Sequence, residues 1–305
     1  MLTKNYQLNI EKSDGTTENI SIEIPLKAGT YDVKYTLGTG NAISAGTIVV
    51  NSTENTYNLN ITLSNNEVKT VQIKTPVILT FADATWEQIA QFSEAGKASE
   101  YFAVGDEKTI QLSTGEEITL VILGFNHDDL TSGGKAGMTI GMKNLLSTTY
   151  PIRDENTNVG GWRLSTMRIS TLPTIFEQLP LNLRSAIKSV DKKGLYGGSS
   201  SNQKDVVITS DKLFLLSAVE VDNTASEKLN YTAEGEQYEY WKTVKDGTVA
   251  TDRIKYLSNG SGLANDWWTR TPYIGEVWSY IAYNVSPGDE SFARLDKGVC
   301  FAFCV

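Results

Sequence analysis

The sequence predicts an α+β protein in which a small all-β domain of repeated hairpins precedes a larger mixed domain. The first 79 residues contain no Trp, Phe, Arg, Cys or His, whereas all six tryptophans follow position 85. Those 79 residues also contain an internal repeat in which apolar and polar side chains alternate, as in strands. Beyond them, helical spacing, short strands and long loops are mixed, which is typical of α+β domains. We therefore place the two domains at 1–79 and 80–305.

The repeat in the first domain has an offset of 51 residues: segment 6–14 recurs as 57–65, and 20–25 matches 71–76. Residues 31–50 form a weaker middle copy. Each unit predicts a β-hairpin, with turn residues such as Ser-Asp-Gly at 13–15. Small hairpins are marginally stable alone, so this domain needs stacked copies, the following domain or other chains. A homo-oligomer, most simply a trimer, is favoured over a monomeric β-sandwich.

The larger domain begins with a helix. Thr85 and Gln88 have the spacing of a capping box, and Gly96 can end the helix, so it should cover about 86–95. Three β-strands are expected next, of which the first two form a hairpin: 109–112, 117–125 and 138–142.

A second helical region follows. Ser165 can cap a helix that runs through Ile169, and Leu172-Pro173 should break it before 174–179 continues. Pro180 should stop that segment. Two further elements are expected, a strand region at 206–216 and a short helix at 234–243.

The last forty residues organise the larger domain. Trp267 and Trp268 are adjacent, and successive side chains of a strand point to opposite faces, so one ring needs a second apolar layer or a rim. Residues 298–305 are apolar after one glycine, which predicts a strand buried on both faces. The residues expected to be structural are Trp162, Trp267, Trp268, Arg270, Pro272, Phe301 and Phe303.

The motifs at the C-terminal end carry a family resemblance. Trp-Trp-Thr-Arg-Thr-Pro at 267–272 and the terminal Gly-Val-x-x-Ala-Phe-Cys-Val resemble a C-type-lectin-like domain of unassigned function in Firmicute surface proteins and their phages. That family is similar to the variable proteins of diversity-generating retroelements. Segments 160–168, 185–188 and 211–217 agree with it, but Cys300-Phe301 replaces the usual Arg-Pro. The resemblance implies a C-type-lectin-like fold for 80–305.

An aromatic loop before the last strand is the expected recognition surface. Its Tyr and Trp residues stand among Ser, Gly, Pro and acidic residues, a composition that suits adaptable binding surfaces and sugar stacking. Packing of these rings in the core or against another subunit is the alternative. The resemblance places the ligand-binding surface of the related domains in the same region. The predicted ligand-binding residues are Tyr273, Glu276, Trp278, Tyr280, Tyr283, Asp289, Glu290 and Arg294.

Catalytic and metal-binding signals are weak. Cys300 and Cys304 would lie about 13 Å apart on one strand, beyond disulfide reach, and should be buried as small apolar side chains. His127 stands alone in a polar turn, where a catalytic or metal role is not expected. We therefore predict no enzyme activity, no cofactor and no metal. The acidic pairs are expected to be solvated: Glu116-Glu117, Asp128-Asp129 and Asp289-Glu290.

Composition limits the partners. A net charge of −9 and a pI of about 4.8 disfavour nucleic acid and anionic membranes, which attract dense Lys and Arg. No run approaches the roughly 18 apolar residues of a membrane span, and the start lacks the apolar core of a signal peptide. Cytoplasmic synthesis is therefore expected, unless a leader has been removed.

The resemblance and the repeats together suggest a phage virion protein, with a secreted or cell-surface protein as the alternative location. Residues 1–79 would attach it to other virion proteins, and the lectin-like domain would recognise a host-cell glycan or protein. Several copies would multiply weak contacts through avidity. A purely structural tail or capsid component is the main alternative, and a cell-wall-active enzyme is a more distant one.

Overall fold

The computed structural model describes residues 3–11, 14–25, 29–37, 42–50, 56–62, 68–74, 79–222, 231–242, 253–276, 279–283 and 289–305. The chain divides into two compact units, Met1–Asp83 and Ala84–Val305. Among the described residues, no helix has the length and apolar character needed to cross a membrane.

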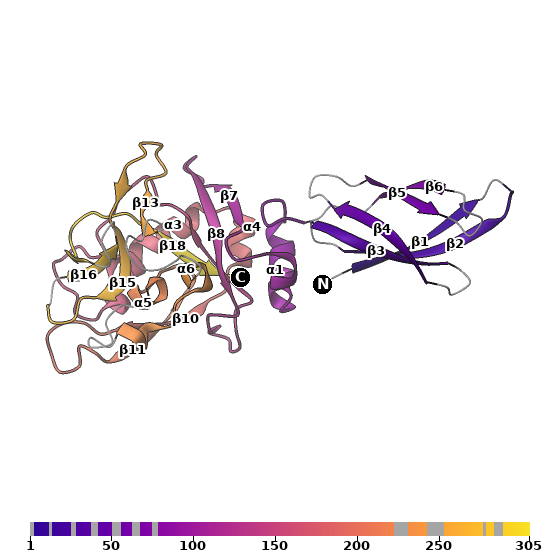
Figure 1. Ribbon diagram of the computed structural model, residues 1–305. Coiled ribbons are helices and arrows are strands. Elements are labelled where there is room, and N and C mark those ends of the chain that lie inside the picture. The colour runs from indigo at the N-terminus through magenta and orange to yellow at the C-terminus, as the bar shows by residue number, and fades with distance from the viewer. Residues whose placement is uncertain are drawn as a thin grey trace. The chain divides into compact units, whose positions relative to one another are not determined.

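The N-terminal unit is entirely β in its described parts (Figure 1). Four strands form an antiparallel sheet in chain order: β1 (Thr3–Glu11), β2 (Thr17–Pro25), β3 (Gly29–Leu37) and β4 (Ala42–Val50). β5 (Thr56–Thr62) and β6 (Val68–Lys74) form a separate hairpin. At the first turn, the Asp14 carboxylate accepts the Thr16 backbone N–H at 2.9 Å, and Gly15 takes a φ of +78°.

The sequence repeat is also a repeat of strand register. Tyr6 of β1 lies opposite Ile22 of β2, and Tyr57 of β5 lies opposite Ile73 of β6, which is the same pairing at an offset of 51 residues. The repeated hairpins that the alternation predicts are therefore present. The Gly-Thr-Gly-Asn segment at 38–41 and the Ser-Asn-Asn segment at 64–66, where the repeat predicts the other turns, lie outside the described residues.

The C-terminal unit is built around a five-stranded antiparallel sheet. Its spatial order is β12 (Phe214–Leu215), β18 (Phe301–Cys304), β9 (Met138–Met142), β8 (Glu117–Phe125) and β7 (Glu107–Gln111). The final strand thus lies inside the sheet, with Phe303 opposite Ile140. Every residue from Val299 to Val305 is buried, so the prediction of a strand enclosed on both faces is confirmed.

Helix α1 (Trp86–Glu94) begins at the predicted capping box. The Thr85 hydroxyl accepts the Gln88 N–H at 3.2 Å, and the Gln88 amide oxygen accepts the Thr85 N–H at 2.9 Å. Gly96, with a φ of +65°, follows the helix end. The apolar stripe of α1 reaches the last strand, because the Trp86 ring meets Phe303 edge-on with centroids 6.1 Å apart.

The second helical region differs from the prediction. A π-helical turn (η2, Met167–Thr171) leads without a break into α3 (Leu172–Gln178). Pro173 does not break the helical region, because it lies in the first turn of α3, where a backbone N–H has no partner within its own helix. Pro180 does end the region, and α4 (Leu181–Ala186) follows it. The predicted helix at 234–243 is instead a 3-10 turn, η4 (Tyr231–Glu234), and a later α6 (Glu239–Lys242).

The remaining elements connect these parts, and several are labelled in Figure 1. Two short ribbons are formed by β10 (Val190–Leu195) with β11 (Val206–Asp211), and by β13 (Lys255–Tyr256) with β14 (Ala264–Asn265). A three-stranded sheet contains β15 (Trp267–Pro272), β16 (Ser279–Tyr283) and β17 (Asp289–Phe292). The short helices are α2 (Ala98–Tyr101), η1 (Trp162–Leu164) and α5 (Ala218–Val221).

The tryptophan pair on β15 fills two layers, as alternation requires. Both rings are fully buried. Trp267 stacks on Trp241 with centroids 6.5 Å apart, whereas Trp268 meets Tyr280 edge-on. Each indole N–H donates to a carbonyl oxygen, that of Arg253 for Trp267 and that of Tyr150 for Trp268, both at 2.9 Å. These bonds satisfy the polar atoms that burial removes from water.

Candidate functional site

Among the predicted ligand-binding residues, Tyr280 has a buried side chain, contrary to the expectation that it faces outward. Its hydroxyl donates to the Gly161 carbonyl oxygen at 3.0 Å, and burial raises its pKa to about 12. Tyr280 lies opposite Pro272 on β15, and this pairing turns the ring toward Trp268. Tyr280 is therefore a core residue and is not available to a ligand.

The other predicted ligand-binding residues differ in the exposure of their side chains. Tyr273 and Glu276 are half-buried, and Glu290 and Arg294 are exposed, so these four remain accessible. Trp278 lies outside the described residues. Only the backbone of two further residues is described, Tyr283 on β16 and Asp289 on β17.

Asn158 fixes the start of the aromatic loop. Its fully buried side chain donates to the carbonyl oxygens of Tyr273 at 2.9 Å and Glu276 at 2.7 Å. Its amide oxygen accepts the Gly198 N–H at 2.8 Å. One side chain thus ties the loop after β15 to the loop after β10, so the accessible residues Tyr273 and Glu276 stand on a fixed backbone.

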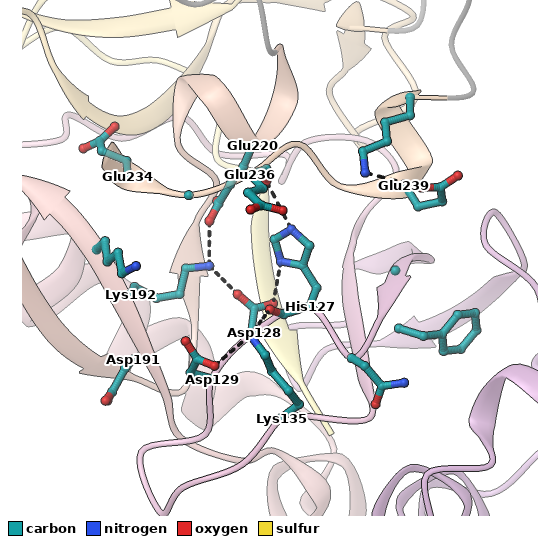
Figure 2. A pocket seen from close by; sticks show the side chains of 16 residues that line it. His127, Asp128, Asp129, Lys135, Asp191, Lys192, Glu220, Glu234, Glu236 and Glu239 are labelled. Atoms are coloured by element: carbon teal, nitrogen blue, oxygen red, sulfur yellow. Dashed lines mark hydrogen bonds and ion pairs between the residues drawn. The ribbon is translucent and has the colours of Figure 1, made fainter. Parts of the chain in front are cut away.

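A polar cleft of about 350 Å³ opens elsewhere on this unit. It is lined by segments 124–129, 191–193 and 234–236, with Lys135, Glu220, Glu239 and Lys242 (Figure 2). Two exposed ion pairs stand at its rim, Asp129 with Lys135 at 2.7 Å and Glu239 with Lys242 at 3.6 Å. The exposed side chains of Lys193 and Glu236 also line it. The rim therefore offers both donors and acceptors to a hydrophilic ligand.

A buried charge cluster, defined as Asp128, Lys192, Glu220, Glu234 and Arg270, lies at the floor of the cleft, and every member except Arg270 lines it. The Lys192 ammonium lies between the carboxylates of Asp128, at 2.6 Å, and Glu220, at 2.7 Å, as Figure 2 shows. Arg270 clamps Glu220 from the other side with two bonds of 2.5 and 2.8 Å. The arginine also donates to three carbonyl oxygens, those of Lys193, Leu215 and Glu234.

This pairing fixes the charges of the cluster. Burial alone would raise the pKa of Asp128 and Glu220, but the adjacent cations outweigh it and hold both pKa values below their usual range. Burial would lower the pKa of Lys192, yet the two carboxylates raise it. Asp128, predicted to be solvated, is therefore a buried ion; only its neighbour Asp129 is exposed.

Glu234 behaves differently. Burial raises its pKa to about 7, despite the opposing effect of Arg270. Its carboxyl oxygens accept hydrogen bonds from the Leu195 N–H, at 2.9 Å, and from the Thr271 hydroxyl. The residue thus joins η4 to β10 and β15, and it changes charge near neutral pH.

His127 lines the cleft, and its ring packs on the buried ring of Tyr238. Their rings stack with centroids 4.0 Å apart, and the Tyr238 hydroxyl donates to Asp128 at 2.8 Å. The His127 Nε2 atom lies 3.1 Å from the Glu236 carbonyl oxygen, so it carries the proton there. Its buried Nδ1 atom lies 3.7 Å from Asp128 Oδ2, and no hydrogen bond to it is found among the residues that the structure describes. The preceding residue, Asn126, has a φ of +51° and is the one non-glycine residue with positive φ in the described chain.

The two cysteines have no features of a reactive site. Both are buried and free, as the sequence predicts, and burial raises the pKa of each thiol. Within the described ranges, no three His, Cys, Asp or Glu side chains are grouped so that they could hold a metal ion.

Sequence reasoning missed the charge cluster, apart from the structural role of Arg270. Its members come from five separate segments, and each is a common surface residue type. One signal was present for Glu220: Ser217 and Glu220 have capping-box spacing, and both bonds of that box are formed at the start of α5. That signal predicts a helix start and does not predict the ion pairs.

Together, the fold and the cleft define a mixed α+β domain with a rigid ionic interior and a polar depression. The family model described as "Domain of unknown function (DUF6273)" matches residues 137–301. The chain belongs to this family. The match includes Lys192, Glu220, Glu234 and Arg270 of the charge cluster, and it ends at Phe301 of β18. Neither the curated proteins nor the solved structures contain a match.

Proposed function

We propose that this chain is a recognition protein whose C-terminal unit binds a hydrophilic ligand, most simply a cell-surface glycan, in the polar cleft. The observation that carries the proposal is an open depression with a fully hydrogen-bonded ionic floor and exposed charges at its rim. A rigid floor limits the ordering cost of binding, and rim carboxylates and lysines suit hydroxyl groups.

Binding suits this site better than catalysis. The carboxylates of Asp128 and Glu220 are held by Lys192 and Arg270, and each is at least 95% buried, so neither is free to attack a substrate. Glu234 has the raised pKa of a general acid, but it is sealed at 1% exposure. The thiols are buried with raised pKa values.

The finer fold assignment belongs to the same proposal. We propose that Ala84–Val305 has a C-type-lectin-like fold. Support comes from the closing strand β18 inside the main sheet, from the tryptophan pair buried on β15, and from long loops between short strands. In such a fold, the accessible residues Tyr273, Glu276, Glu290 and Arg294 would extend the recognition surface beyond the cleft.

The N-terminal unit would supply attachment and multiple copies. Its repeated hairpins contain strands whose outer edges meet no other described strand, such as β1, and open edges accept strands from other chains. We propose that it joins the chain into a homo-oligomer, with a trimer favoured, and to other virion proteins. Weak contacts at each cleft would then add through avidity.

A purely architectural role in a virion is the second candidate. Burial of Tyr280 favours it, because one ring of the predicted recognition loop is part of the core. Under this alternative, the polar cleft would have no cell-surface ligand, and only the N-terminal unit would engage a partner.

The proposal is tested by binding of the full chain to a panel of Firmicute cells and to a glycan array. A double variant, Lys193→Ala with Glu236→Ala, removes two exposed rim charges without touching the buried cluster. Loss of two charge-assisted contacts should weaken binding about 10-fold or more. The matched control is Lys97→Ala with Glu100→Ala, an exposed pair outside the cleft, which should bind like the parent chain. Equal binding by both double variants, or no binding by the parent chain, would reject the cleft as the recognition site.

A further inference from the structure

The charge cluster beneath the cleft contains one carboxyl group more than its cations can pair. Its carboxyl groups belong to Asp128, Glu220 and Glu234, its cations are Lys192 and Arg270, and none is more than 5% exposed. Asp128 and Glu220 each form ion pairs with these cations. The Glu234 carboxyl accepts hydrogen bonds from Leu195 and Thr271, but no ion pair to it is found within the described ranges. Arg270 donates to the backbone carbonyl oxygen of Glu234, at 2.9 Å.

A buried carboxylate without a cationic partner is costly, and the usual outcome is that the group binds a proton. We infer that Glu234 is a buried proton-binding site, and that loss of its proton loosens segment 231–242, which forms one wall of the cleft. This inference does not depend on what the cleft binds. It follows from the count of charges and from the contacts that hold the segment.

The pKa values of the groups around Glu234 indicate that, among them, Glu234 is the residue that titrates near neutral pH. Four groups with charged or titratable side chains interact with Glu234: Arg270 on β15, Glu220 on α5, Tyr231 on η4 and Tyr280 on β16. Three more surround Glu220, namely Lys192 on β10, Asp128 after β8 and Tyr238 before α6. The lysine and arginine keep raised pKa values, the two other carboxyls keep lowered ones, and the tyrosines are raised. Among these groups, Glu234 is the one with a pKa of about 7, which burial raises from an ordinary 4.5.

The contacts of Glu234 explain how a change in its charge would affect the wall of the cleft. Its carboxyl connects η4 to β10 through Leu195 and to β15 through Thr271. The next residues along the chain, Gly235 and Glu236, line the cleft, and the Glu236 carbonyl oxygen meets His127. A negative charge at Glu234 repels the Glu220 carboxylate. Ionisation of Glu234 therefore destabilises its hydrogen-bonded contacts with β10 and β15, which hold this wall of the cleft in place.

The direction of the pH effect follows from linkage. The folded pKa is above the unfolded value, so the stabilisation is complete below pH 4.5 and is lost as the pH rises through about 7. Between pH 5 and pH 8, the unfolding equilibrium constant should rise about 70-fold from this residue alone.

Urea unfolding followed by tryptophan emission, at intervals from pH 5 to pH 8, tests the inference in the full chain. Glu234→Gln keeps the size and hydrogen-bonding capacity of the protonated residue, so the 70-fold dependence should disappear. Glu236→Gln, at an exposed position two residues away, should retain it. The same pH dependence in Glu234→Gln as in the parent chain would overturn the inference.

A second measurement needs no variant. The Leu195 amide donates to Glu234, so its protection against hydrogen exchange, corrected for the intrinsic rate, should fall from pH 6 to pH 8. Unchanged protection across that range would also overturn the inference.

Discussion

Replacement of Arg270 by leucine tests the role of the charge cluster in holding the fold. The guanidinium is fully buried and donates to the Glu220 carboxylate at 2.5 and 2.8 Å. It also donates to the carbonyl oxygens of Lys193, Leu215 and Glu234, each at 2.9 Å. Leucine would remove all five of these hydrogen bonds, and Glu220 would keep Lys192 as its ionic partner and the Ser217 N–H as a further donor.

Breaking a buried ion pair on one side costs about 3–5 kcal/mol, since a charge remains without compensation. That is a large part of the roughly 5–15 kcal/mol of a typical domain. The appropriate assay is urea unfolding by tryptophan emission, because all six tryptophans belong to the C-terminal unit. The double variant Arg270→Leu with Glu220→Leu should lose less unfolding free energy than the two single variants lose together, by about 1 kcal/mol or more. A loss below about 1 kcal/mol in Arg270→Leu would refute the reasoning.

Two further predictions concern the closing strand. Phe303→Ala removes a ring that is fully buried and packed against Trp86, so unfolding free energy should fall by about 3–5 kcal/mol; a fall below about 1 kcal/mol in the same urea assay would show that the strand is not central to the core. Cys300 and Cys304 should react with a thiol reagent only after unfolding, because both thiols are buried and have raised pKa values; rapid labelling of the native chain at neutral pH would contradict their placement.

Local signals in the sequence predicted much of the scaffold. The capping box of α1 depends on two residues three positions apart, and both of its bonds are present. The apolar run at the C-terminal end predicts a strand buried on both faces, and every residue of β18 is buried. The hairpin repeat is visible because its alternation and its 51-residue offset are properties of neighbouring residues.

Features that depend on long-range packing were not predictable in this way. Alternation along β16 places Tyr280 on the opposite face of the strand from the residues next to it, but the sequence pattern does not indicate which of the two faces is buried. Pairing with β15 decides this, and Tyr280 turns toward Trp268. Similarly, Lys192 and Lys193 are adjacent lysines on β10, yet one is buried in ion pairs and the other is exposed. Their difference arises from Asp128 and Glu220, which are distant in sequence.

Pro173 shows a competing local rule. A proline inside a helical pattern usually ends the helix, which is why a break was predicted there. In the structure, the π-helical turn η2 precedes it, so the proline falls in the first turn of a new helix. At that position a backbone N–H would have no hydrogen-bond partner within its own helix, so its absence in proline does not weaken α3.

The central claim, recognition through the polar cleft, is tested most directly by hydrogen-exchange mapping of the full chain with and without a glycan that it binds on the array. The account predicts that bound glycan protects backbone amides in 124–129, 191–193 and 234–236, the segments that line the cleft. Protection restricted to 1–83, or none within those three segments, would contradict it.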